Sequence, residues 1–153
     1  MTSLASGGQY LIFTLRNRDF AVPIDHVWEI NRMPDITPVP MKEAHVVGVI
    51  NLRGKVIAVV DLGLMFGHNS YEPSKESCVL ILQSRKDKVG TIVDCVKSVV
   101  QIASSDIEPC VLYGNTGPQH YFNGMAKIGS DLAIMIDLEN DLGEVHAPQE
   151  TEV

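Results

Sequence analysis

One arrangement of residues occurs twice in this chain, and this repeat limits the possible fold more than any other feature of the sequence. Residues 11–27 read LIFTLRNRDFAVPIDHV, and residues 80–96 read LILQSRKDKVGTIVDCV. Each segment contains an apolar run, a charged turn, a second apolar run and then Asp-x-Val, so that Asp25 matches Asp94. A repeat of this kind predicts two copies of one structural unit.

Two further blocks recur in the same order. Residues 35–38 (DITP) match residues 106–109 (DIEP), and residues 48–62 (GVINLRGKVIAVVDL) match residues 124–138 (GMAKIGSDLAIMIDL). Any all-β chain can repeat a Val/Ile alternation by chance. Asp, Gly and Pro at fixed places are harder to attribute to chance, because each favours a particular backbone geometry. We call two residues that match in this way sister positions.

The repeated unit has the properties of a small β-barrel. Its apolar runs are short and rich in Val, Ile and Leu, and turn residues recur about every ten residues. We therefore expect an all-β chain with short helical turns, one barrel over about 10–67 and a second over about 78–142. The sequence leaves open to which of the two barrels the first strand belongs. Residues 1–8 are expected to form a flexible arm and residues 143–153 a disordered tail. Asp61 is expected to cap a brief helix.

Features that only one unit carries need an explanation other than the shared fold. Arg53 lies in a turn whose sister position is Gly129, so the hairpin can form without an arginine. Two interpretations remain open for Arg53: a bidentate contact with another molecule, or an ordinary solvated charge. Trp28 has Lys97 as its sister. It either anchors a partner or covers the end of a barrel.

Composition argues against several classes of protein. The net charge is −7 and the Lys and Arg residues are dispersed, which disfavours a nucleic-acid binder. No apolar run is long enough to insert into a membrane, and the first residues lack the pattern of a secretory signal. The odd number of cysteines, without a Cys-x-x-Cys spacing, is typical of reduced thiols in the cytoplasm. They are Cys78, Cys95 and Cys110.

The sequence contains no arrangement typical of catalysis. It has no Gly-x-Ser-x-Gly, P-loop, His-Glu-x-x-His or dinucleotide fingerprint. The histidines are scattered without metal-ligand spacing, so we expect no metal and no cofactor. Asp25 and Asp94 are better explained as turn or cap residues than as paired catalytic carboxylates, because each belongs to the repeat. A rival hypothesis, an enzymatic or small-molecule-binding barrel, would need a pocket with converging polar groups.

The segment from Tyr10 to Pro40, followed by GVINLRGKVIAVVDL, resembles the CheW family of chemotaxis coupling proteins. The resemblance extends from about Gln9 to Leu142. It implies two SH3-like five-stranded β-barrels and no enzymatic activity. It also implies a cytoplasmic adaptor that links the tips of methyl-accepting chemoreceptors to the regulatory domain of the histidine kinase CheA. An alternative is a CheW-like scaffold of another chemosensory-type pathway, such as one for twitching motility.

The resemblance also implies roles for individual residues. The receptor tip, a helical hairpin, would lie in a groove between the barrels, and the kinase would bind elsewhere. The expected receptor-binding residues are Val27, Glu29, Ile30, Arg53, Val79 and Val99, and the expected kinase-binding residue is Gly48. One departure is Gly63, which follows VVDL where many family members have a basic residue.

Overall fold

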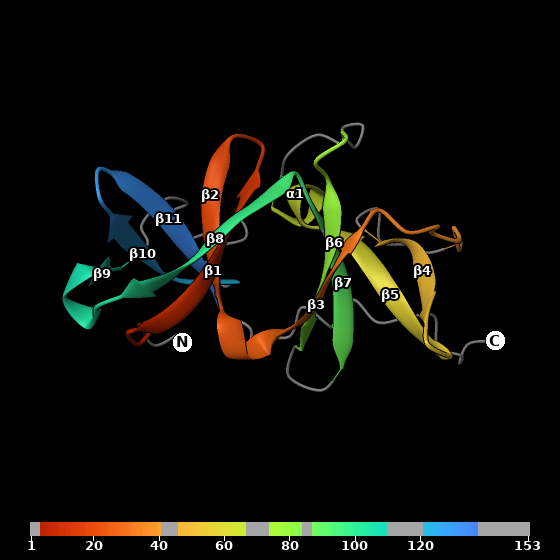
Figure 1. Ribbon diagram of the computed structural model, residues 1–153, viewed down its shortest axis with the longest axis horizontal. Helices are drawn as coiled ribbons and strands as arrows, with labels where there is room; N and C mark the ends of the chain where they lie inside the picture. The colour runs from red at the N-terminus through yellow and green to blue at the C-terminus, as the bar shows by residue number, and fades with distance from the viewer. Residues whose placement is uncertain (1–3, 41–45, 67–73, 84–86, 110–120, 138–153) are drawn as a thin grey trace.

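The computed structural model describes residues 4–40, 46–66, 74–83, 87–109 and 121–137, which form two β-sheets side by side (Figure 1). We call the six-stranded sheet and its loops lobe A, and the five-stranded sheet and its loops lobe B. The predicted tail over 143–153 lies outside the described residues, as does the end of the second predicted barrel beyond residue 137.

Both sheets are built from short strands, as expected. Lobe A contains β1 (Gly8–Leu15), β2 (Arg18–Pro23), β8 (Cys95–Ile102), β9 (Ile107–Glu108), β10 (Phe122–Ile128) and β11 (Asp131–Ile136) in the order β8-β1-β2-β11-β10-β9. Lobe B contains β3 (Val27–Arg32), β4 (Val46–Leu52), β5 (Lys55–Asp61), β6 (Cys78–Gln83) and β7 (Lys88–Val93) in the order β3-β6-β7-β5-β4. The short helices are η1 (Ile24–His26), α1 (Leu62–Met65) and η2 (Ser104–Asp106). The all-β fold class with short helical turns is therefore confirmed.

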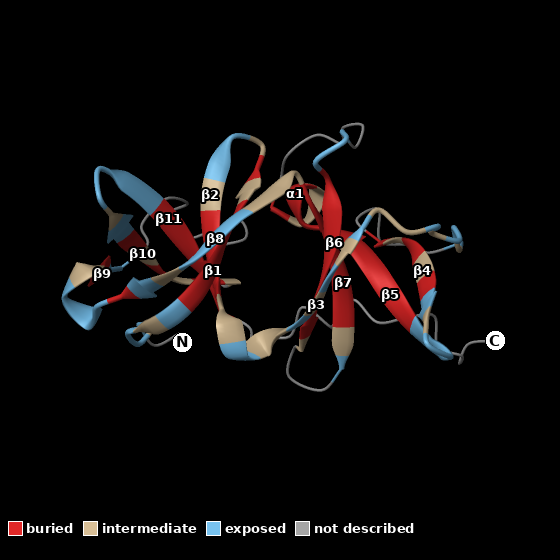
Figure 2. Cartoon of the chain, in the orientation of Figure 1, coloured by how far each residue is buried: buried red, intermediate tan, exposed pale blue. Residues whose placement is uncertain are grey.

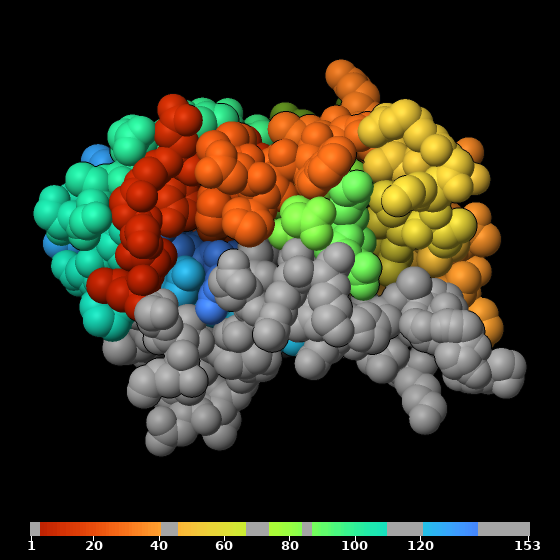
Figure 3. Space-filling view, turned by 90° about the horizontal axis from the view of Figure 1, so that it is seen from below, coloured from red at the N-terminus to blue at the C-terminus, as the bar shows by residue number. Residues whose placement is uncertain are grey.

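The chain crosses between the two lobes twice. It leaves lobe A after β2, builds all of lobe B from β3 to β7, and returns to lobe A at β8. The crossings fall at the two copies of Asp-x-Val, Asp25–Val27 and Asp94–Val96. Seen from below, the orange surface of the first crossing joins the two lobes (Figure 3).

Strand pairing shows that the repeated units exchange their first hairpins. Val27 of β3 pairs with Leu82 of β6, and the sister positions Val96 of β8 and Phe13 of β1 pair in the same way. Each pairing contains a register shift at the same place. Each lobe therefore combines the first hairpin of one unit with the later strands of the other.

This exchange corrects the expected barrel boundaries. The divisions at about 10–67 and 78–142 would place β1 and β2 with β3, β4 and β5, whereas β1 pairs with β8 and β2 pairs with β11. The repeat located the two units correctly. It could not assign the first hairpin of each unit to a lobe, because β1 pairs with β8 in the same geometry as β6 pairs with β3.

The predicted flexible arm over 1–8 is also corrected for the part that the structure describes. The Ala5 amide donates to the Asn123 carbonyl at 2.9 Å, and the Tyr10 hydroxyl donates to the Ser6 carbonyl at 2.6 Å. Gly8 already begins β1. Residues 5–8 are therefore held on lobe A by hydrogen bonds to its backbone and side chains.

A shared core joins the lobes, and all four phenylalanines of the chain lie in it. Phe20 of β2 stacks on Phe13 and on Phe66, each with ring centroids 5.7 Å apart, and Phe66 meets Phe122 edge to face at 4.9 Å. Phe66 directly follows α1 of lobe B, whereas the other three rings belong to lobe A. Smaller cores fill the interior of each lobe, as the red strand centres in Figure 2 show.

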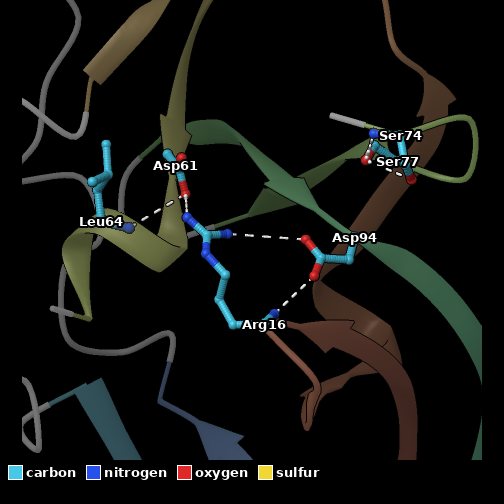
Figure 4. Close-up of polar contacts among 6 residues, drawn as sticks. All are labelled: Arg16, Asp61, Leu64, Ser74, Ser77 and Asp94. Carbon is cyan, nitrogen blue, oxygen red and sulfur yellow. Dashed lines mark hydrogen bonds and ion pairs between the residues drawn. The ribbon is translucent and has the colours of Figure 1, made fainter. Parts of the chain in front are cut away.

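Arg16 ties the β1–β2 turn to lobe B (Figure 4). Its amide donates to Asp94 Oδ2 at 2.8 Å, and its guanidinium lies 3.5 Å from Asp61 Oδ1. Asp61 also caps α1 by accepting from the Leu64 amide at 3.3 Å, which confirms the predicted cap. A Cβ at Gly63 would lie only 2.5 Å from the Arg16 guanidinium carbon, so this glycine leaves the space that the cation occupies.

Because each lobe needs strands from both repeated units, neither unit can complete a lobe alone. We expect separately expressed residues 1–73 and 74–153 to lack the native fold and an equimolar mixture to recover it, as measured by dispersion of amide NMR signals. A natively folded, monomeric 1–73 fragment would contradict the hairpin exchange.

Candidate protein-interaction site

The turn between β4 and β5 presents Arg53 on a fixed backbone. Leu52 pairs with Lys55, so the loop has two residues, and both have positive φ: 50° at Arg53 and 89° at Gly54. This is the geometry of a type I′ hairpin turn. The Asn51 side chain accepts from the Gly54 amide at 2.9 Å and holds the turn closed.

The Arg53 side chain forms a two-pronged ion pair with Glu29 of β3. Its guanidinium nitrogens donate to Glu29 Oε1 at 2.5 Å and to Glu29 Oε2 at 3.3 Å. β3 and β4 are the two edge strands of the lobe B sheet. The ion pair therefore connects Glu29 on one edge strand to the turn that follows the other edge strand. Arg53 remains 70% exposed and Glu29 22% exposed, which leaves the guanidinium accessible to a partner.

The ion pair changes the acidity of both groups. The hydrogen bond from Arg53 holds the pKa of the Glu29 carboxyl below its usual value, and the same contact raises the pKa of Arg53. Both groups are therefore charged throughout the neutral range, and the pair is lost only when acid protonates Glu29 below the normal titration range of a carboxylate.

Beside the ion pair, Ile30 of β3 is 48% exposed. Ile30 pairs with Leu80, whose side chain belongs to the shared core, so Ile30 lies on the sheet face that turns toward that core. Val27 lies half-buried against the same core. The structure therefore brings together Val27, Ile30, Glu29 and Arg53 around one edge of lobe B.

Val99 of β8 is the sister of Ile30 and is also 48% exposed. It pairs with Leu11, another member of the shared core, so it occupies the equivalent margin of lobe A. The two lobes thus each present one accessible apolar side chain beside the core that joins them.

Val79 does not belong to this surface. Its side chain is fully buried in the interior of lobe B, so the expectation that it lines a receptor groove is corrected. β6 is buried on both faces, and its sequence is a continuous apolar run. Such a run has no alternation of apolar and polar residues, so the sequence does not show which side chains face the interior of the lobe.

Gly48 is also buried, and its role is explained by packing. Thr37 lies across β4, with its amide donating to the Val49 carbonyl at 2.8 Å and its carbonyl accepting from the Val49 amide at 2.9 Å. A Cβ at Gly48 would lie 2.2 Å from the Thr37 carbonyl oxygen. The sister strand repeats this contact, since Glu108 pairs with Met125 next to Gly124.

Two contacts around this surface were missed by sequence reasoning. The Asn51 side chain holds the turn, and the ammonium group of Lys88 lies 3.6 Å above the centre of the Trp28 ring. Spacing could not predict the second contact, because Lys88 reaches Trp28 from another strand. Within the described ranges, no group of three or more His, Cys, Asp or Glu side chains could hold a metal, and no helix is long and apolar enough to cross a membrane.

Comparisons with known proteins agree on one family. Residues 9–145 match the model of the CheW-like domain. The chain is 30% identical to chemotaxis protein CheW of Rhizobium meliloti over 90% of this chain and 89% of that protein. It is 28% identical to chemotaxis protein CheW of Thermotoga maritima, with the same coverage of both chains. A crystal structure of the scaffolding protein TtCheW from Thermoanaerobacter tengcongensis superposes with a TM-score of 0.79 at 32% identity, covering 86% of this chain and 90% of that one.

Replacing Gly48 with alanine should destabilise the fold by about 2 kcal/mol, because the added methyl group forces Thr37 away from β4. Chemical denaturation would measure this change. Val56→Ala, at a 65% exposed position on the neighbouring strand, is the control and should change stability by no more than about 0.5 kcal/mol. An unchanged stability of Gly48→Ala would contradict this prediction, because it would mean that Thr37 can move away from β4 at little cost.

The Glu29 carboxyl should titrate below the usual range of a glutamate, as followed by side-chain NMR. Arg53→Ala should move its midpoint upward, because the largest cause of the lowered pKa is then removed. An unchanged midpoint would mean that the ion pair does not form in solution.

Proposed function

The chain belongs to the CheW family, and from this premise we propose that it is a non-enzymatic adaptor that couples methyl-accepting chemoreceptors to the histidine kinase CheA. The relatives that share nearly the whole length of this chain are named chemotaxis proteins, and the structural relative is described as a scaffolding protein. As an adaptor, this protein would act in the cytoplasm, at receptor tips near the inner face of the membrane.

The observation that carries the proposal is the Arg53–Glu29 ion pair beside the exposed Ile30. The sister positions of Arg53 and Glu29 are Gly129 and Ser98, so lobe A has the same fold without this pair. A feature that the fold does not require, set on a rigid turn and 70% exposed, is better explained by contact with a partner.

The receptor tip would contact the margins of both lobes. Ile30 and Val99 would supply apolar contacts on either side of the shared core. Val27, half-buried against that core, would add apolar surface beside Ile30. Arg53, oriented by Glu29, would set the register of the receptor helix through a charge-assisted hydrogen bond. Apolar burial supplies affinity in such an interface, and the charges select the partner.

The kinase would bind at a separate surface around β4. Gly48 would act there indirectly, because it allows Thr37 and the residues beside it to lie flat on β4. A substitution at Gly48 would therefore disturb kinase binding by displacing this segment. Direct contact with the buried glycine is not needed.

Reconstitution with a receptor cytoplasmic fragment and CheA tests the proposal. The wild-type protein should make kinase activity depend on the receptor. Arg53→Ala should retain the fold and kinase binding but lose most receptor-dependent control, because the side chain is exposed and its proposed contact is with the receptor.

Lys127→Ala is the matched control. Lys127 forms an exposed ion pair with Glu108 at 2.7 Å in lobe A, so the variant removes an equivalent charge pair away from the site. Its kinase control should remain normal. A wild-type protein that binds receptor and CheA without affecting kinase activity would instead favour a scaffold of another chemosensory-type pathway.

A further inference from the structure

Trp28 is the only tryptophan of the chain, and it is 57% exposed on β3. The β3–β6 pairing shifts register between Val27 and Glu29, which leaves Trp28 in the bulge between them. An exposed tryptophan in a folded domain is a common anchor of protein interfaces, because it offers a large rigid apolar surface.

One neighbour of the ring is the cation of Lys88, for which the described residues provide no carboxylate partner. Lys88 of β7 places its ammonium nitrogen 3.6 Å above the ring centre. No carboxylate within the part of the chain that the structure describes forms an ion pair with Lys88. The aromatic contact is weak at an exposed site, so this charge can still attract an acidic group from outside.

In lobe A, the sister positions of Trp28 and Lys88 are occupied by two residues that bind each other. The sister positions of Trp28 and Lys88 are Lys97 and Asp19, and these two form an ion pair at 3.1 Å. The hydrogen bond from Lys97 to Asp19 raises the pKa of Lys97. The same fold position therefore holds an ion pair in lobe A. In lobe B it holds an exposed ring and a cation that pairs with no carboxylate among the described residues.

The open position adjoins the proposed receptor surface. Trp28 precedes Glu29, the partner of Arg53, and lies two residues from the exposed Ile30. Two residues along a strand span about 6.6 Å. One helical turn rises about 5.4 Å, and β3 is an edge strand of lobe B, so successive turns of a helix that lies along this edge could contact Ile30 and Trp28.

We propose that Trp28 and Lys88 extend the receptor-contact surface and select a receptor helix that carries a carboxylate one turn away from its apolar contact with Ile30. This inference rests on the proposed function, and it adds a specificity element that lobe A lacks. The charge complementarity is local, because the Lys88 ammonium beside Trp28 is the group that would attract a carboxylate of the receptor helix.

Binding of a receptor cytoplasmic fragment to full-length variants tests the proposal by calorimetry. Trp28→Lys introduces the residue that lobe A carries at this position, so the fold should be retained, as circular dichroism would verify. It should weaken binding about tenfold or more. Lys88→Ala should weaken binding a few-fold and should reduce the dependence of affinity on salt.

Leu132→Ala is the matched control, since Leu132 is 54% exposed on β11 of lobe A; its affinity should be unchanged. A charge exchange identifies the partner group. Among receptor fragments with single acidic residues changed to lysine, one should bind the wild type weakly and recover with Lys88→Glu.

The outcomes separate the two proposals. If the wild-type protein does not bind the receptor fragment, the proposed function fails. If the wild type binds and Trp28→Lys binds equally well, only the role of Trp28 is overturned. Trp28-dependent binding to anionic phospholipid vesicles, with receptor affinity unchanged, would likewise overturn it and assign the surface to a membrane.

Discussion

The fold depends on the exchange of hairpins between the two repeated units, and on the shared core that this exchange creates. β1 and β2 are completed only by β8 and β11, and β6 and β7 only by β3 and β5. Aromatic rings from both lobes then pack into one cluster. Because interiors are densely packed, the two lobes are held in one relative position. A rigid pair of lobes can present side chains from both to a single partner.

This scaffold is nearly symmetric, and its proposed function lies in the departures from symmetry. Ile30 and Val99 occupy equivalent margins with equal exposure. The Arg53–Glu29 pair and the Trp28–Lys88 contact occur in lobe B alone among the described parts of the two lobes. Comparing two copies within one chain therefore separates residues that maintain the fold from residues available to a partner. Gly48 belongs to the first group, because its sister Gly124 lies beside the same strand contact.

Much of the site could be predicted because its signals are local. The hairpin turn at Arg53 and Gly54 follows from the glycine between two apolar runs, and the exposure of Arg53 follows from its replacement by Gly129. Local signals failed for Val79, since a strand covered on both faces gives no alternation to interpret. They also could not show that Lys88 approaches Trp28, because strand pairing brings these residues together across the sheet.

The sequence by itself determined the β class, the two repeated units, the hairpin turns and the cap at Asp61, because short-range backbone preferences set each of these. Only the tertiary structure decided which hairpin completes which lobe. The two places have equivalent pairing, so no local preference distinguishes them, and the choice follows from where the chain crosses at Asp25–Val27 and Asp94–Val96. The tertiary structure likewise decided that Arg16 fills the space beside Gly63, since that contact requires the β1–β2 turn to reach the end of β5.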